Sequence, residues 1–256
     1  MTIPRVFFVG TAGSGKSTLV NTFKDWLIGL NYDAITVNLD PGAEFLPYEP
    51  DIDVRESISL EDVMAEYNLG PNGAQIVAAD LLINEVGEIT ERIESFDSDY
   101  VLIDTPGQLE LFAFRQSSSI LVESFGVDSS AIVYLLDSAL LKDPQSYASL
   151  RFLGLSVLTK FYLPFLPVAS KSDLLEPREA ENIRRWDRNK AEFVDDLRRL
   201  AATVNVQLSE EIISATESLN LLGDSIFASS QTSNGMEDIY AFLQNIFHGS
   251  EDLEKR

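Results

Sequence analysis

The sequence predicts an α/β protein with a doubly wound, mostly parallel sheet that is flanked by helices and carries helical insertions. The first observation behind this prediction is that short apolar runs alternate with longer amphipathic segments over nearly the whole chain. The second is that the runs are apolar at successive positions, which indicates strands buried on both faces. Strands of that kind are joined through helices by right-handed crossovers, and the alternation along the chain fits this arrangement.

Six apolar runs are expected to form the strands, and five segments are expected to form the main helices. The expected strands are Val6–Val9, Ala34–Asn38, Tyr100–Ile103, Ala131–Leu136, Phe165–Ala169 and Ser225–Ala228. The expected helices are Lys16–Gly29, Leu109–Phe125, Pro144–Tyr162, Pro177–Thr203 and Gly235–Phe247.

Two regions interrupt the alternation, and we interpret both as insertions in a single domain spanning residues 1–256. The first, at about 41–79, contains no convincing strand. There we expect a loop, a helix near Leu60–Tyr67, a turn at Gly70–Asn72 and then another helix. The second insertion, at about 176–220, is expected to be helical, and it carries much of the charge of the chain.

Composition narrows the classes of function. The formal net charge of −22 would repel nucleic-acid phosphates and anionic lipids, so direct contact with nucleic acid or a membrane surface is disfavoured. The absence of cysteine excludes disulfides, thiolate zinc sites and cysteine nucleophiles. The chain begins without a charged and apolar leader and has no apolar stretch that could span a bilayer, so we expect a soluble, cytoplasmic protein.

Residues 10–17 match the phosphate-binding pattern G-x-x-x-x-G-K-[ST] in full, after an apolar strand and before a helix. Glycines let backbone N–H groups turn towards phosphates, and the helix N-terminus adds a favourable dipole. Lys16 would bind the β- and γ-phosphates, and the Ser17 hydroxyl would be a ligand of Mg²⁺. The loop therefore predicts a nucleoside triphosphate site of the P-loop NTPase type. Its nucleotide-binding residues are expected to be Gly13, Ser14, Gly15, Lys16, Ser17 and Thr18.

Two aspartates follow other expected strands. Asp104 ends an apolar run, as expected for a carboxylate that serves Mg²⁺ directly or through water. Pro106-Gly107 then allows the backbone to swing towards a γ-phosphate, as in a nucleotide-sensing switch. Asp40 precedes Pro41-Gly42, which is a plain turn signal, but it also lies where open α/β sheets bind ligands.

A further loop predicts which base is bound. The Asp173 carboxylate can accept hydrogen bonds from N1–H and the exocyclic amine of guanine, whereas adenine presents an acceptor at N1. Lys171 can lay its apolar stem over the base. The usual GTPase pattern is N-K-x-D, and Ser170 stands here in place of its asparagine, which weakens the assignment of guanine without reversing it.

The loop at residues 229–235 is expected to complete the base site, with Ser230 and Gln231 among the nucleotide-binding residues. It follows the last expected strand, so its backbone N–H groups would be available to the base carbonyl. Ser214–Thr216 is closer in sequence to the guanine-loop tripeptide S-A-K, but no strand precedes it, and we set it aside.

Four motifs in this order closely resemble the GPN-loop GTPases of archaea and eukaryotes. They are the P-loop Gly10–Thr18, Asn38–Pro41, Tyr67–Gly73 with its Gly-Pro-Asn tripeptide, and Asp104–Glu110. The resemblance extends over essentially the whole chain. It implies a dimer in which two GTP sites face each other, and hydrolysis of GTP to GDP.

The resemblance also implies roles for individual residues. Asn72 would reach into the site of the partner subunit and contact the γ-phosphate, with Gly70 and Pro71 shaping the loop. Asp40, Gln108 and Glu110 would hold the attacking water. A catalytic set of Asp40, Asn72, Gln108 and Glu110 follows, with Ser17 and Asp104 as the residues that serve Mg²⁺.

Other functions remain open on the residues alone. An ATPase of the same dimeric class is disfavoured by Asp173, and a small-molecule kinase is disfavoured by the lack of an arginine-rich lid. An assembly factor that binds a protein client is compatible with a GTPase. Eukaryotic members of the family are associated with RNA polymerase assembly, but no residue here identifies a client.

Overall fold

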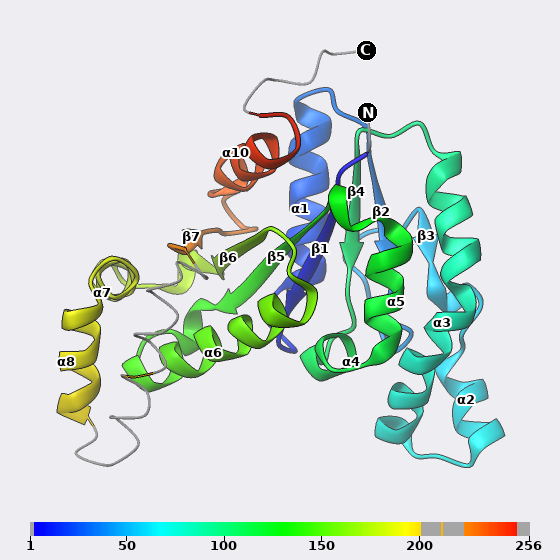
Figure 1. The fold of residues 1–256 in the computed structure, drawn as a ribbon, viewed down its shortest axis with the longest axis horizontal. Coiled ribbons are helices and arrows are strands. Elements are labelled where there is room, and N and C mark those ends of the chain that lie inside the picture. The colour runs from blue at the N-terminus through cyan, green and yellow to red at the C-terminus, as the bar shows by residue number, and fades with distance from the viewer. Residues whose placement is uncertain (1–2, 201–210, 212–222, 250–256) are drawn as a thin grey trace.

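In the computed structural model, which describes residues 3–200, 211 and 223–249, seven strands form one sheet (Figure 1). The strand order is β3-β2-β4-β1-β5-β6-β7, and every neighbouring pair is parallel. The predicted fold class is therefore confirmed. The strands are β1 Arg5–Gly10, β2 Ala34–Asn38, β3 Ile52–Asp53, β4 Tyr100–Asp104, β5 Ser130–Asp137, β6 Phe165–Ser170 and β7 Ile226–Phe227.

Strand β3 was not expected from the sequence, because its two residues leave no apolar run to detect. It extends the edge of the sheet by pairing with the end of β2. All six expected strands are present, although only two residues of Ser225–Ala228 pair as β7.

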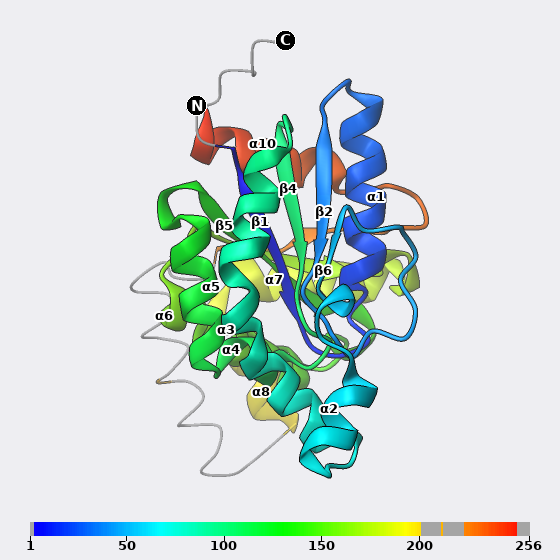
Figure 2. The same ribbon diagram turned by 90° about the vertical axis from the view of Figure 1, so that its right-hand side faces the viewer.

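The helices lie on both faces of the sheet, as expected for a doubly wound fold. Figure 2 shows α1 on one side of the strands, and α3, α5 and α6 on the other. Within the described residues no helix is both long and apolar enough to cross a membrane. The helices are α1 Lys16–Gly29, α2 Leu60–Tyr67, α3 Pro71–Ser95, α4 Leu109–Ala113, α5 Gln116–Phe125, α6 Pro144–Phe161, α7 Pro177–Arg188, α8 Lys190–Leu200 and α10 Met236–Phe247.

Two of the expected helices are each divided in two. Leu109–Phe125 forms α4 and α5, with an extended backbone at Arg115 between them. Pro177–Thr203 forms α7 and α8, separated at Asn189. The side chain of Asn189 accepts a hydrogen bond from the backbone N–H of Glu192, and asparagine favours such a capping position over a helix interior. The end of the second segment and Ser214–Thr216 lie outside the described residues.

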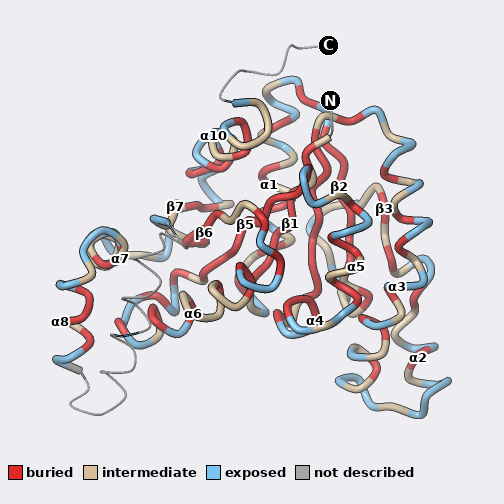
Figure 3. The backbone as a smooth tube through the Cα atoms, viewed as in Figure 1, coloured by how far each residue is buried: buried red, intermediate tan, exposed pale blue. Residues whose placement is uncertain are grey.

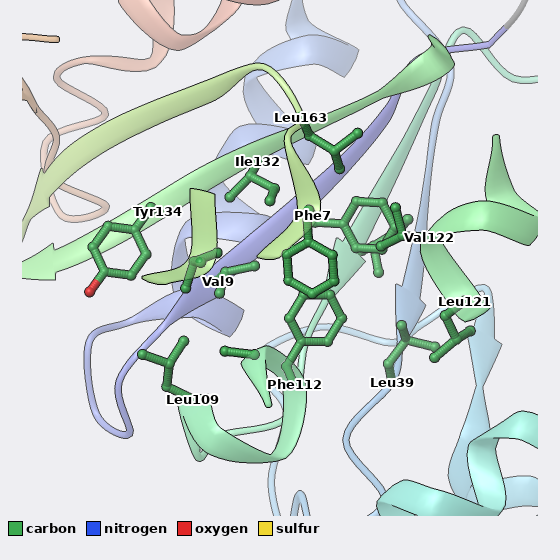
Figure 4. Packing of buried hydrophobic residues seen from close by; sticks show 14 of the residues in the cluster. Phe7, Val9, Leu39, Leu109, Phe112, Leu121, Val122, Ile132, Tyr134 and Leu163 are labelled. Carbon is green, nitrogen blue, oxygen red and sulfur yellow. The ribbon is translucent and has the colours of Figure 1, made fainter. Parts of the chain in front are cut away.

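Strand β1 explains how the two layers are packed. Successive side chains of a strand point to opposite faces, so Phe7 and Val9 join one buried cluster and Val6 and Phe8 join the other. Figure 4 shows Phe7 against Phe112 of α4, with ring centroids 5.9 Å apart. Most residues of β1, β2, β4, β5 and β6 are buried, those of β7 are half-buried, and exposed residues lie on the outer helices and the loops (Figure 3). This double burial fixes the sheet from which the loops of the site extend.

The Gly-Pro-Asn segment differs from the expected turn. The turn lies earlier, where Asn68 ends α2 in a left-handed conformation, and Gly70 is the N-cap of α3. Pro71 and Asn72 are in the first turn of α3 because proline fits the first helical position, where its missing N–H is not needed. Helix α3 then runs to Ser95, well past the expected limit of the first insertion.

Candidate functional site

The loop between β1 and α1 has the geometry of an anion-binding loop. Gly13 and Gly15 have φ angles of 75° and 90°, a left-handed backbone that glycine adopts without strain. Gly15 is the N-cap of α1 and provides no side-chain hydrogen bond to the first turn. The first backbone N–H groups of α1 are therefore left for a ligand, as in sites that bind phosphate.

Lys16 is buried beneath this loop, with 6% of its surface exposed. Its Nζ donates hydrogen bonds to three backbone carbonyls, those of Gly10 at 3.0 Å, Thr11 at 3.1 Å and Gly107 at 3.0 Å. Burial lowers the pKa of Lys16, and the charges of Asp104 and Asp40 oppose that shift. Two of its partners belong to the loop itself and one to the segment after β4, so this cation connects the two.

Asp104 is positioned by the sheet. It ends β4 between β1 and β2, in register with Phe8 and Asn38. Its side chain is buried, and its Oδ2 accepts a hydrogen bond of 3.0 Å from the hydroxyl of Tyr48. Burial raises the pKa of Asp104 to about 6, an effect opposed by Ser17, Tyr48 and Lys16.

The surroundings of Asp104 fit a divalent cation. Its Oδ1 is buried and accepts no hydrogen bond from the described residues. Ser17, the other expected ligand, is close enough to lower the pKa of this carboxyl. The described residues contain no cluster of three or more acidic or histidine side chains that could hold a metal. A cation at Asp104 would take its remaining ligands from nucleotide and water, which is typical of Mg²⁺.

Asp40 joins the loop after β2 to the loop after β4. Its Oδ1 accepts a hydrogen bond of 2.9 Å from the backbone N–H of Gly42, which is the local turn suggested by the sequence. Its Oδ2 accepts one of 2.7 Å from the backbone N–H of Gly107. Gly107 is thus held on both sides, by Asp40 at its N–H and by Lys16 at its carbonyl.

The other expected catalytic residues lie at or near the starts of α4 and α3. Gln108 precedes α4, and its Nε2 donates a hydrogen bond of 2.8 Å to Oε1 of Gln75 on α3. Glu110 is in α4 and exposed. Asn72 is exposed at the start of α3, and its side chain makes no hydrogen bond to the part of the chain that the structure describes. In Figures 1 and 2 the start of α3 projects beyond the sheet together with α2.

A pocket of about 400 Å³ adjoins the phosphate loop. It gathers residues from the loop, the start of α1, the segment after β6 and the segment after β7. All of the expected base-site residues line it. The lining residues are Ser14, Gly15, Thr18, Leu19, Ser170, Lys171, Asp173, Leu174, Ala228, Ser230 and Gln231.

Ser170, which stands in place of the asparagine of the usual N-K-x-D pattern, makes a contact with the phosphate loop. Its hydroxyl is buried and donates a hydrogen bond of 2.7 Å to the carbonyl of Ser14. Lys171 contacts the same loop, because its Nζ donates hydrogen bonds to the carbonyl of Gly13 and, at 2.8 Å, to Oδ2 of Asp137. A serine therefore connects the base pocket to the phosphate loop without the amide.

Four residues of the site were not identified from the sequence. They are Tyr48, which contacts Asp104; Gln75, which contacts Gln108; Asp137, which pairs with Lys171; and Ser229, which donates a hydrogen bond of 2.5 Å to Asp173. Asp137 ends β5 and Ser229 follows β7, so their places at strand ends were a usable signal. Tyr48 and Gln75 had none, because each reaches the site from a loop or helix far along the chain.

A parallel sheet with this loop after its central strand and a polar pocket at the strand ends defines a P-loop nucleotide-binding protein. Comparisons with known proteins refine that class. The chain matches the family model described as a conserved hypothetical ATP-binding protein over residues 8–249. A GPN-loop GTPase of Pyrococcus abyssi is 36% identical over 242 residues, covering 91% of this chain and 93% of that protein.

Two further comparisons agree. GPN-loop GTPase 1 of Schizosaccharomyces pombe is 30% identical over 249 residues, covering 91% of this chain and 66% of its own length. The crystal structure of a GTPase in apo form from Pyrococcus abyssi has a TM-score of 0.86 and 34% identity, covering 97% of this chain and 99% of that one. The chain belongs to the GPN-loop GTPase family.

Proposed function

We propose that this protein, which hydrolyses GTP to GDP and phosphate as a member of the GPN-loop GTPase family, uses Mg²⁺ and works as a homodimer. Its conformation would change with the bound nucleotide and thereby act on a protein client. The observation that carries the proposal is that Gly107 is hydrogen-bonded to both Lys16 and Asp40, through its carbonyl and its N–H respectively. Both side chains have an expected role towards the γ-phosphate or the attacking water. A triphosphate would therefore change the contacts of Gly107 when it binds.

Recognition of the base is supported by the pocket after β6. Asp173 presents a carboxylate with one oxygen already bonded to Ser229, which fixes the orientation of the group. A carboxylate accepts from both N–H groups on the guanine edge, whereas N1 of adenine would face it with a lone pair. The description of the matching family model names ATP instead. Paired titrations with GTP and ATP separate the two, and equal affinities would overturn the guanine assignment.

Phosphoryl transfer requires an in-line water and stabilisation of charge on the γ-oxygens. Within the described part of the chain, the hydrogen-bond partners of Lys16 Nζ are three backbone carbonyls, and Lys16 would exchange them for β- and γ-oxygens. Bound Mg²⁺, held by Ser17 and Asp104, would add positive charge on the same oxygens. Asp40, Gln108 and Glu110 would orient the water.

The same contacts provide a conformational switch. A γ-phosphate that draws Lys16 away from the Gly107 carbonyl would remove one of the two hydrogen bonds that Lys16 and Asp40 make with Gly107. The segment continues directly into Gln108 and α4, so its movement is transmitted to a packed element. Release of phosphate after hydrolysis would allow Lys16 to bond the carbonyls again.

Dimerisation is supported by the position of Asn72. It is exposed at the tip of a helical pair and its side chain has no hydrogen-bond partner among the described residues, so its amide is available to a neighbouring molecule. An amide supplied from a second subunit would stabilise the charge of the transferring phosphate. It is neutral, so it should contribute less than an arginine finger, whose contribution to the rate is on the order of 10³–10⁵.

The test compares two variants of the full chain by phosphate release and by binding of a fluorescent GTP analogue. Asn72→Ala should bind GTP as the wild type does and lose most turnover. Lys16→Ala should lose affinity for the triphosphate itself, because it removes a direct charge on the phosphates. Wild-type turnover by Asn72→Ala would overturn the role of the dimer and leave nucleotide binding untouched.

The client is tested separately by capture from a lysate. The protein loaded with GDP is compared with the protein loaded with a non-hydrolysable GTP analogue. A client of the switch should be retained by one form and not by the other. RNA polymerase subunits are the first candidates by family resemblance, and equal recovery with both nucleotides would contradict a nucleotide-controlled client.

A further inference from the structure

The side chain of Gln75 lies between the two loops that carry the expected water-holding residues. Its Oε1 accepts the 2.8 Å hydrogen bond from Gln108. On its other side it packs against Gly42, where a Cβ atom would be 3.0 Å from Nε2 and 3.4 Å from Cγ of Gln75. The absence of a side chain at Gly42 therefore makes room for this glutamine.

These contacts close a ring through the centre of the site. Gly42 donates its N–H to one oxygen of Asp40, and Gly107 donates its N–H to the other. Gly107 is followed by Gln108, which returns to Gln75. Four of the five residues in the ring belong to the loops after β2 and β4, and Gln75 alone comes from α3.

Gln75 also connects the ring to the Gly-Pro-Asn segment. It follows Asn72 by three positions in α3, and residues three apart lie on neighbouring positions of one helix face. Ala74 and Ala78 on the same helix are fully buried, so this part of α3 is held firmly against the core. A displacement of the start of α3 would therefore also move the side chain of Gln75.

We propose that Gln75 is a positioning residue for Gln108, which it holds in the orientation that the attacking water requires. Through α3 it links the geometry of the Gly-Pro-Asn segment to hydrolysis in its own subunit. This inference rests on the proposed role of Gln108 in holding that water.

The test begins with Gln75→Met, which keeps the length of the side chain and removes its hydrogen-bonding groups. Loss of one hydrogen bond of this kind should lower kcat about 3- to 10-fold, while KM for GTP changes by less than about twofold. Gln145→Met is the matched control, because Gln145 is exposed near the start of α6 and makes no side-chain hydrogen bond to the described residues. It should keep the wild-type kcat.

A double-mutant cycle with Gln108→Ala decides whether Gln75 acts through Gln108. If it does, Gln75→Met combined with Gln108→Ala should have the kcat of Gln108→Ala alone. A further loss of about 3- to 10-fold in the double variant would mean that Gln75 acts independently, and would overturn the inference while leaving the proposed function intact. An unchanged kcat in Gln108→Ala would instead overturn the proposed role of Gln108 and this inference with it.

Should Gln75→Met fold poorly, Gln75→Ala provides the same comparison with a smaller side chain. Thermal denaturation of each variant identifies a loss of folded protein. The inference would also be overturned if kcat fell only in proportion to the loss of folded protein and the double-mutant cycle showed no coupling to Gln108.

Discussion

Tyr48 donates a hydrogen bond of 3.0 Å to Oδ2 of Asp104, so the loop after β2 closes over the carboxylate that ends β4. The phenol is partly buried, and burial together with the charge of Asp104 raises the pKa of Tyr48, which keeps its proton in place. The bond occupies one carboxylate oxygen, and the buried Oδ1 accepts no hydrogen bond from the residues that the structure describes. Tyr48 thus orients Asp104 with one oxygen available for a cation.

Tyr48→Phe should therefore weaken Mg²⁺ binding in the presence of GDP. The variant removes a group that orients a metal-binding carboxylate, and changes of this kind reduce metal affinity by about 10-fold or more. A Mg²⁺ titration of the complex with a fluorescent GDP analogue measures it. Tyr162→Phe makes the same chemical change at a tyrosine that is 79% exposed, and should leave the affinity unchanged. Equal or tighter binding by Tyr48→Phe would contradict the orienting role.

Mg²⁺ affinity should also depend on pH through Asp104. Its pKa is raised to about 6 by burial, so in the nucleotide-free protein the carboxyl becomes protonated as the pH falls through that value. Only the carboxylate binds the cation, so affinity should fall about tenfold per pH unit below about pH 6 and level off above about pH 7. Asp104→Asn cannot titrate, and its weaker affinity should not show this dependence.

The raised pKa of Asp104 makes the stability of the fold depend on pH in the opposite direction to Mg²⁺ affinity. The folded protein binds a proton at Asp104 between the ordinary carboxyl pKa of about 3.9 and the raised value of about 6, where the unfolded chain has released it. By linkage, the contribution of this group to the free energy of unfolding decreases as the pH rises through that window. In the absence of nucleotide, Asp104→Asn should therefore gain stability relative to the wild type above about pH 6.

The sheet and the phosphate loop were predictable because their signals are local. An apolar strand, a glycine-rich loop and a helix follow one another within residues 5–29, and each constrains only its neighbours. The carboxyl ends of parallel strands lie at one edge of a sheet, so Asp104, Asp40 and Asp173 were expected to face a common site. The contacts that Asp104 and Asp40 make across β1, β2 and β4 agree with that expectation.

The residues that escaped prediction depend on loop paths set by distant packing. Tyr48 reaches Asp104 across 56 positions of sequence, and Gln75 reaches Gln108 across 33. No pattern in the sequence indicates that either pair of residues would be in contact. Pro71 was compatible with both outcomes, since proline is favoured at the first position of a helix as well as in turns.

Asp173→Asn should change which base is preferred. The asparagine keeps one carbonyl acceptor and replaces the other oxygen with an N–H₂ donor, which would face the exocyclic amine of guanine. Xanthine carries a carbonyl there and retains N1–H, so it matches the new side chain. The variant should bind GTP more weakly by at least about 100-fold and gain affinity for xanthosine triphosphate. Competition against fluorescent GDP measures both, and an unchanged preference for GTP would show that Asp173 does not contact the base.

Ser229→Ala tests the orientation of the same carboxylate. Ser229 is buried, and its hydroxyl donates a hydrogen bond to Oδ1 of Asp173 and accepts one of 3.2 Å from the backbone N–H of Gln231. Removing the hydroxyl should lower the affinities for GDP and GTP equally, by about 2- to 12-fold, because the base is common to both nucleotides. A loss confined to GTP would place its effect at the γ-phosphate and contradict this assignment.

Gly235→Ala should destabilise the fold at the end of the base loop. Gly235 has a φ of 81°, and a Cβ atom there would lie 2.4 Å from the carbonyl oxygen of Phe227 and 2.9 Å from Cα of Ala228. Backbone strain and overpacking together should reduce the free energy of unfolding by about 2 kcal/mol or more, which lowers Tm by about 5 °C. Gly29→Ala is the control, because no atom lies within 4 Å of its Cβ position and alanine is favoured in a helix. Since Phe227 and Ala228 lead into the loop that holds Ser229, the displaced backbone should also weaken nucleotide binding in Gly235→Ala, and thermal denaturation with and without GDP measures both effects.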